Sequence, residues 1–124
     1  MKYMLLIYTS PEPPELPAEE AEAEMGKWYA YSAALAASGA LIAGDPLEGP
    51  SSATTLQVRD GKRLVTDGPF AETKEAVGGF DLIEAASMDE AVEIAAAHPI
   101  AAFGTIEVRP LWGQGTDVEG EPGR

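Results

Sequence analysis

The order of the expected elements constrains the fold of this chain more than any single motif does. Apolar periodicity and turn residues divide the sequence into two strand–helix–strand halves with a β-hairpin between them. The expected elements are a strand at 2–8, a helix at 17–38, a strand at 40–43, a hairpin at 54–59 and 62–66, a strand at 79–86, a helix at 88–98 and a strand at 105–110. Two such halves form a ferredoxin-like βαββαβ sandwich, with one antiparallel sheet and two helices on one face. The sequence therefore predicts an α+β fold with an extra β-hairpin.

Local signals mark where the helices end and where the hairpin turns. Gly39 is expected to end the first helix, and Ser87 with Glu90 forms a capping box at the start of the second. Asp60-Gly61 is the dipeptide that a two-residue hairpin turn favours. The resulting register pairs Arg59 with Lys62, Val58 with Arg63, and Leu56 with Val65. The apolar face of the first helix is expected to consist of Ala21, Met25, Trp28, Ser32 and Leu35.

Length and pattern indicate one domain over residues 1–112, followed by a disordered acidic tail over residues 113–124. Both helices are expected on the same face of the sheet, so the other face is left open. Large open apolar faces are rare on monomers, and a homodimer through this face is expected. The apolar run at residues 1–8 is too short to span a membrane and lacks a small-residue cleavage site. We expect no membrane association and a cytoplasmic location.

The charge balance excludes several classes of function. The net charge is −13, from 21 acidic residues against eight basic ones. Phosphate backbones are bound by clustered Lys and Arg, so no nucleic-acid partner is expected. The chain has no cysteine, which excludes thiol catalysis and thiolate metal sites. Its single histidine and scattered carboxylates show no metal-ligand spacing, and the sequence predicts neither a metal nor a cofactor.

The segment between the hairpin and the next strand concentrates functional chemistry. Residues 67–75 read Asp-Gly-Pro-Phe-Ala-Glu-Thr-Lys-Glu. On a structural interpretation, Asp67 caps a helical turn, Phe70 anchors it, and the charges are solvated. On a functional interpretation the segment is a pocket wall, in which Asp67 and Glu72 accept protons or hold a ligand donor, Lys74 binds an anionic group and Phe70 contributes to ligand binding. The Gly78-Gly79 pair would then let the backbone approach a ligand closely.

Two further residues are candidates outside this segment. His98 is the one side chain whose ordinary pKa lies near neutrality, which makes it a candidate base or ligand. Its place at the end of the second helix also fits a structural role, because a side chain there can stabilise the last carbonyls. Arg109 ends the last strand, where it is either a surface cation or a partner for a carboxylate or an anionic ligand.

Residues 67–75 resemble the signature of the DGPFAETKE family, a branch of the YCII-related proteins. Other stretches of the chain resemble the same family, namely residues 1–8, 54–59, 78–80, 98–99 and 106–110. The resemblance covers about residues 1–111 and implies a dimeric ferredoxin-like α+β barrel. It also implies a small-molecule enzyme or binder with a cleft at the dimer. Some YCII-related proteins are proposed to use a His–Asp dyad whose His lies in the first half of the chain. No histidine precedes His98 here, so that dyad is not carried over.

Two functions remain open at this point, together with a dimer that has no ligand. The first is a small-molecule enzyme in which Asp67 is the base and Lys74 or Arg109 holds an anionic substrate. The second is a metabolite-sensing or accessory module without catalysis. The resemblance implies for it an association with extracytoplasmic-function sigma factors, near which relatives occur. Whether the chain is an enzyme, and which molecule it binds, is not determined by these residues.

Overall fold

The structure is a computed structural model that describes residues 1–10 and 15–114 of the chain. Eight regular elements are joined by two short 3₁₀ turns, Pro50–Ser52 and Pro99–Ala102. The elements are β1 (Lys2–Thr9), α1 (Ala18–Ala37), β2 (Leu41–Pro46), β3 (Thr54–Arg59), β4 (Lys62–Asp67), β5 (Ala76–Glu84), α2 (Met88–Ala96) and β6 (Thr105–Pro110). Their order is the one predicted from the sequence.

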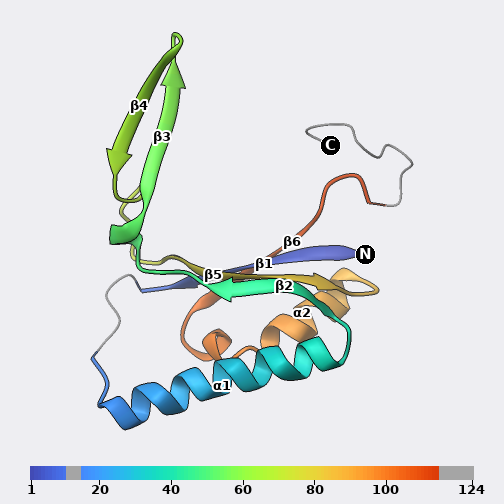
Figure 1. Cartoon of the computed structure of the whole chain (residues 1–124). Coiled ribbons are helices and arrows are strands. Elements are labelled where there is room, and N and C mark those ends of the chain that lie inside the picture. Colours follow the sequence, from blue (N-terminus) through green and yellow to red (C-terminus); the bar gives the residue numbers. More distant parts are fainter. Residues whose placement is uncertain (11–14, 115–124) are drawn as a thin grey trace.

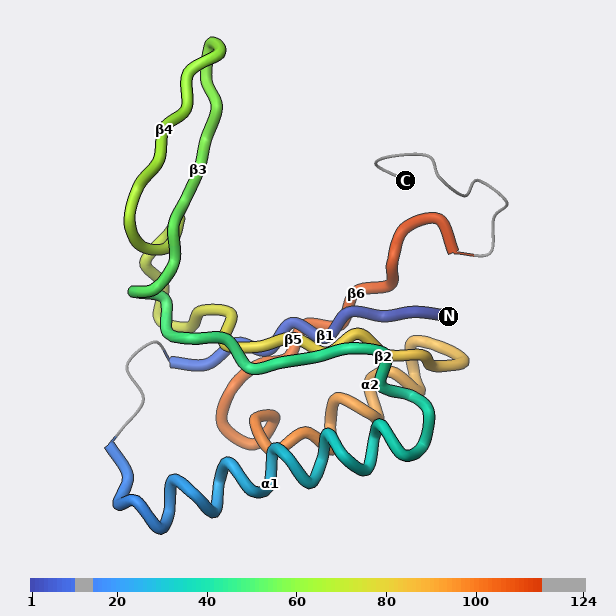
Figure 2. The backbone as a smooth tube through the Cα atoms, viewed as in Figure 1, coloured from blue at the N-terminus to red at the C-terminus, as the bar shows by residue number. Residues whose placement is uncertain are grey.

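Four strands form one antiparallel sheet in the order β2-β5-β1-β6. Figure 1 shows α1 and α2 packed on the same face of this sheet. This strand order is that of a ferredoxin-like sandwich, so the predicted fold class is confirmed. The hairpin of β3 and β4 forms a separate two-stranded sheet and rises from the opposite face (Figures 1 and 2).

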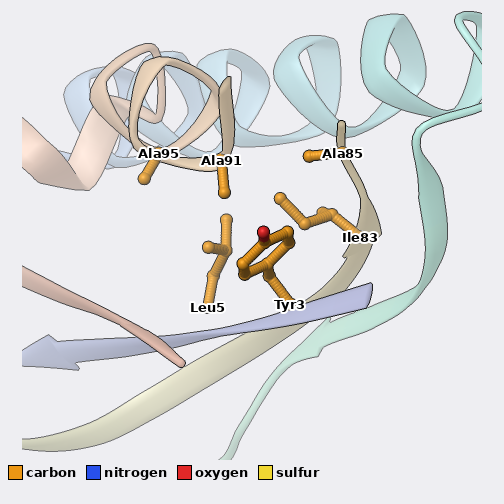
Figure 3. Packing of buried hydrophobic residues seen from close by; sticks show 6 residues of the cluster. All are labelled: Tyr3, Leu5, Ile83, Ala85, Ala91 and Ala95. Atoms are coloured by element: carbon orange, nitrogen blue, oxygen red, sulfur yellow. The ribbon is translucent and has the colours of Figure 1, made fainter. Parts of the chain in front are cut away.

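The core lies between the sheet and the helices. Alternate residues of the central strands point towards the helices, because side chains along a strand alternate between its two faces. Tyr3 and Leu5 of β1 and Ile83 of β5 meet the small side chains of Ala91 and Ala95 on α2, as Figure 3 shows. Ile83, Leu5 and Ala91 have no exposed surface. The alanines allow α2 to lie close to the sheet.

The inward face of α1 differs from the one predicted. Met25 was expected to face the core, but 43% of its surface is exposed. Tyr31 turns inward instead, and its hydroxyl donates a hydrogen bond of 2.8 Å to the carbonyl oxygen of Ile94. Leu35 packs against the core. The helix is rich in alanine on every side, so its sequence pattern does not define one face sharply, and contact with α2 selects the face.

Two strands are longer than the sequence suggested. Gly44-Asp45-Pro46 was expected to break the chain, but β2 continues through it and pairs Asp45 with Phe80. A proline is tolerated there because β2 is an edge strand and Pro46 is its last residue. β5 begins at Ala76 rather than at Gly79, since β1 extends to Thr9 and pairs with it.

The hairpin has the predicted register, with Arg59 opposite Lys62, Val58 opposite Arg63 and Leu56 opposite Val65. Asp60 and Gly61 have φ angles of 52° and 75°, as the two central positions of a type I′ turn require. Gly39 has a φ of 83° after the last turn of α1, so the predicted helix stop is also confirmed.

The predicted tail over residues 113–124 falls mostly on residues 115–124, which lie outside the described residues. Gln114 is described, and its side-chain amide donates to the carbonyl oxygens of Lys2 at 2.6 Å and Leu111 at 3.0 Å. The domain boundary at residue 112 stays a prediction. Within the described parts of the chain, neither helix is long and apolar enough to cross a membrane.

Candidate functional site

The segment after β4 is fixed to the rest of the chain at both ends. At its start, the N–H of Gly68 donates to the carbonyl of Ala53 at 2.7 Å, and the Thr55 hydroxyl donates to the carbonyl of Gly68 at 2.8 Å. Gly68 has a φ of 95°, a conformation that favours glycine. At the far end, the Thr105 hydroxyl on β6 donates to Oε1 of Glu75 at 2.8 Å. These contacts hold residues 68–75 at the base of the hairpin.

Part of this segment, residues 69 and 71–74, lines a cleft of about 650 Å³, called the loop cleft below. Residues 49–51 and Ser10 line the cleft as well. A second hollow of about 750 Å³ shares residues 49, 50, 69, 71 and 73 with the loop cleft and adds Tyr8, Phe70, Glu75 and Val77. Both volumes lie in the range of small-molecule sites. The predicted pocket wall is therefore concave in the structure.

The chemistry of the loop cleft is set by Lys74 and Glu72, which both line it. None of the ion pairs formed among residues 1–10 and 15–114 includes Lys74. Phe70 presents 79% of its surface to solvent beside the second hollow. A ligand that spans both hollows would thus meet an ammonium group at one end and apolar surface at the other.

Asp67 occupies a different position from the one its proposed roles suggest. It is the last residue of β4, opposite Thr54, and residues 68–75 contain no helical turn that it could cap. The capping role is therefore wrong. Asp67 lines neither the loop cleft nor the second hollow. Its role as a base stays a prediction.

Arg109 lies on the sheet face opposite the helices, within a small polar network. Its guanidinium donates to Oε2 of Glu107, and the Tyr8 hydroxyl donates to Oε1 of the same carboxylate at 3.1 Å. The hydrogen bond from Arg109 and the one from Tyr8 lower the pKa of Glu107. The hydrogen bond to Glu107 raises the pKa of Tyr8. Tyr8 also lines the second hollow, so this network reaches the edge of the candidate site.

His98 lies away from the loop cleft, in the interior beneath the sheet. Its ring packs edge-on against Trp28 and Tyr31, with centroid distances of 4.7 Å to each. Its Nδ1 accepts a hydrogen bond of 3.0 Å from the N–H of Ile100, at the start of the turn Pro99–Ala102. The predicted structural role at the C-terminus of α2 is corrected, because His98 instead caps the N-terminus of the following turn.

Asp81 is a buried carboxylate that the sequence interpretation missed. It lies on β5 with 3% of its surface exposed, and its Oδ2 has no hydrogen-bond partner among the described residues. The Nε2 of His98 is also buried and has no hydrogen-bond partner among the described residues. Burial raises the pKa of Asp81 to about 6 and lowers the pKa of His98 to about 4. The alternation of side chains along β5 could have predicted this burial, because Asp81 is two residues from the fully buried Ile83 and so points to the same face of the sheet.

The two adjacent glycines have separate structural causes. A Cβ at Gly79 would lie 3.2 Å from Cζ2 of Trp28 and 3.2 Å from the carbonyl oxygen of Asp45. Packing against Trp28 and β2 thus explains Gly79 without a ligand. A Cβ at Gly78 would lie 2.6 Å from Oγ1 of Thr9, so packing against β1 explains this glycine too. Gly78 also lines a smaller hollow of about 220 Å³ that shares Ser10, Gly49 and Pro50 with the loop cleft. The structure therefore gathers Phe70, Glu72, Lys74 and Gly78 around the hairpin base, and places Gly79, His98 and Arg109 elsewhere.

The chain belongs to the YCII-related family, whose domain it matches over residues 1–113. The narrower assignment to the DGPFAETKE branch stays a prediction. An uncharacterized protein of Rhizobium meliloti (strain 1021) is 49% identical over 65 residues, which are 49% of this chain and 51% of that protein. The chain thus matches about half the length of this curated relative.

A solved structure with a similar fold is the 5-chloro-2-hydroxyhydroquinone dehydrochlorinase of Burkholderia phenoliruptrix AC1100, in complex with 2,5-dihydroxybenzoquinone. The alignment covers 90% of this chain and 93% of the dehydrochlorinase, with 19% identity and a TM-score of 0.47. Similarity at this level does not carry the substrate or the reaction of that enzyme over to this chain.

The buried Asp81 predicts a pH-dependent difference between two variants. Its pKa is raised from 3.8 to about 6, so the folded state is penalised above pH 6 by about 3 kcal/mol, and the penalty disappears as the pH falls to about 4. Asp81→Asn removes this carboxylate and keeps its shape. We expect the variant to be more stable than the natural chain at pH 7, with the difference shrinking as the pH falls from 7 to 4.

The measurement is urea unfolding of both proteins at half-unit pH steps between 4 and 7. His98 is present in both proteins, so its own titration cancels in the difference to first order. A difference in unfolding free energy that stays constant across this range would show that Asp81 is not a buried, destabilising charge.

Proposed function

We propose that this protein binds a small molecule in the loop cleft, through an anionic group held by Lys74 and an apolar body against Phe70 and Val77. The observation that carries this proposal is the cleft itself. A segment fixed at both ends lines a cleft of about 650 Å³ together with residues 49–51, and its Lys74 forms no ion pair among the described residues. The chain has a net charge of −13, so a lysine in the cleft gives an anionic ligand a local positive charge that most of the surface lacks.

We further propose that the bound molecule undergoes carboxylate acid–base chemistry. Glu72 lines the loop cleft and Glu75 lines the second hollow, so two carboxylates border the proposed ligand. Asp67 directly precedes this segment at the end of β4 and keeps the role of base in this proposal, which requires that the ligand extend beyond the two hollows to reach its carboxylate. Binding and turnover are separable, because Lys74 acts on the charge of the ligand and Asp67 on a proton.

The working form of the protein is proposed to be a homodimer. The helix-free face of the sheet carries Met4 beside Leu82 and Leu6 beside Phe80, as the strand register requires. Both helices cover the other face (Figure 1), so these four half-buried side chains form an apolar surface that no helix of the described residues covers. A second copy would bury it, and the hollow containing Tyr8 borders this face. The proposed site therefore lies at the edge of the proposed dimer interface.

Replacing Lys74 by alanine should weaken the binding of anionic ligands. Hydrogen bonds to charged groups contribute about 1.5–3 kcal/mol, which corresponds to a loss of roughly 10- to 100-fold in affinity. The measurement is a ligand-observed NMR screen of aliphatic and aromatic carboxylates, followed by titration of the best binder. Lys27→Ala is the matched control, because Lys27 pairs with Glu24 on the surface of α1, away from the cleft. Equal affinities of the natural chain and Lys74→Ala would contradict the assignment.

Asp67→Asn tests the catalytic part of the proposal separately. The variant keeps the size of the side chain and removes the base, and Asp67 lines neither hollow. We expect the affinity for the best carboxylate from the screen to change by less than about 3-fold. We also expect any turnover of that compound, followed by mass spectrometry, to fall by at least 100-fold, a loss typical of removing a general base. Undiminished turnover would exclude Asp67 as the base.

Sedimentation equilibrium at micromolar concentration should give a mass of about 26 kDa, twice the 13.0 kDa of one chain. Leu82→Asp places a charge in the middle of the open sheet face and should weaken the dimer at least 10-fold, with an unchanged circular dichroism spectrum. Val92→Asp is the control, because Val92 is 47% exposed on α2, on the other side of the sheet. A natural chain that sediments as a monomer would refute the dimer.

A further inference from the structure

The β3–β4 hairpin stands away from the body of the protein, as Figures 1 and 2 show. Its two strands contact each other extensively and no other element to a comparable extent. An isolated two-stranded hairpin is only marginally stable in water, and it needs a further packing surface to be well ordered. The described residues of this chain supply that surface only at the base of the hairpin, where Gly68 meets Ala53 and Thr55.

The hairpin is amphipathic, and its apolar face is turned to solvent. Side chains alternate along a strand, so Leu56, Val58 and Val65 share one face. They are 57%, 54% and 63% exposed. The other face carries mostly polar side chains, among them Arg59 and Lys62 next to the turn, together with Leu64, which is 48% exposed; its Thr55 and Gln57 are half-buried. The described residues of this chain therefore leave the apolar face largely uncovered.

The tip of the hairpin has a charge opposite to the rest of the chain. Arg59, Lys62 and Arg63 are three of the eight basic residues, and they lie within five positions that contain one acidic residue, Asp60. Exposed acidic residues lie on both helices: Glu19, Glu20 and Glu22 on α1, and Asp89, Glu90 and Glu93 on α2. A surface that matches the hairpin is thus apolar along its length and acidic at its end.

We propose that the hairpin is an arm that clasps a second copy of this chain, with its basic tip against the acidic helices of the partner. This inference rests on the dimer proposed above. The arm rises on the same side of the sheet as the open face (Figure 1), so a copy that covers this face would lie beside the arm. A second copy carries the same apolar residues on that face, beside the Tyr8–Glu107–Arg109 network, and exposed acidic residues on its helices, so it offers apolar surface and acidic charge to the arm.

The length of the arm agrees with this placement. Each strand has six residues, which at about 3.4 Å per residue extend over roughly 20 Å. Two packed sheets lie about 10 Å apart. An arm that leaves the sheet steeply therefore passes the sheet of the partner and ends at the level of its helix layer. The acidic side chains of α1 and α2 lie in that layer.

The clasp would also complete the candidate site. β3 follows directly from residues 49–53, and β4 leads directly into residues 68–75, which are the two walls of the loop cleft. Holding the arm on a partner fixes both walls relative to each other. The exposed Phe70, next to the base of the arm, would then lie beside the partner.

Zero-length carbodiimide coupling tests the contact directly, because it joins an ammonium to a carboxylate in an existing ion pair. Equal amounts of ¹⁴N- and ¹⁵N-labelled chain are mixed, allowed to exchange and coupled. We expect mixed-isotope peptides that join Lys62 to a carboxylate of α1 or α2. Lys62→Arg keeps the charge and should lose the link while remaining a dimer.

A charge reversal gives an independent measurement. Arg59→Glu, Lys62→Glu and Arg63→Glu together should raise the dimer dissociation constant at least 10-fold, whereas Lys27→Glu on α1 should not raise it. The circular dichroism spectrum of each variant checks that it is folded. The clasp is wrong, and the dimer stands, if the natural chain is a dimer without interchain Lys62 links and if the reversal changes its dissociation constant less than 2-fold.

Two other outcomes would also overturn the clasp. A natural chain that is monomeric in sedimentation would refute both the dimer and the clasp. Submicromolar binding to random duplex DNA at 150 mM salt, lost in the triple reversal, would make the tip a nucleic-acid contact instead.

Discussion

Packing of the central strands against α2 is the contact on which the rest of this structure depends. Leu5 and Ile83 are fully buried because Ala91 and Ala95 let the helix lie close above them. Two helices are enough to cover one face of a four-stranded sheet, and the part of the chain that the structure describes supplies none for the other face. The apolar side chains of that second face are the physical reason for the dimer we propose.

The same core contains two polar groups that an apolar interior disfavours. Asp81 and His98 are buried, and each leaves one polar atom without a partner among the described residues. Burying an unpaired polar group costs roughly 1–3 kcal/mol, so these residues reduce the stability that the apolar core provides. Burial therefore raises the pKa of Asp81 and lowers the pKa of His98, and both shifts favour the uncharged form of the side chain. Tyr31 contributes to this environment: burial and the charge of Asp81 raise the pKa of its hydroxyl.

The candidate site does not depend on these buried groups. It is built where the hairpin joins the sheet, from residues that precede β3 and residues that follow β4. The glycine conformation at Gly68 and the hydrogen bond from Thr105 to Glu75 hold the second of these segments in place. The arrangement explains why a charged segment of this length occurs inside a compact domain, since such connections are usually functional when they are ordered.

The sequence by itself determined the order of the elements, the hairpin register and the helix stop at Gly39. Each of these depends on neighbouring residues: alternation, the Asp60-Gly61 turn, and a glycine with a positive φ. It also indicated that residues 67–75 form a pocket wall, because their composition is unusual for a simple connection.

Only the tertiary structure decided which candidates share a site, and it separated His98, Gly79 and Arg109 from Lys74 and Glu72. It also selected the inward face of α1 and buried Asp81. Such placements depend on contacts between residues far apart in the chain, here between β5, α1 and the turn after α2, and no local pattern specifies them.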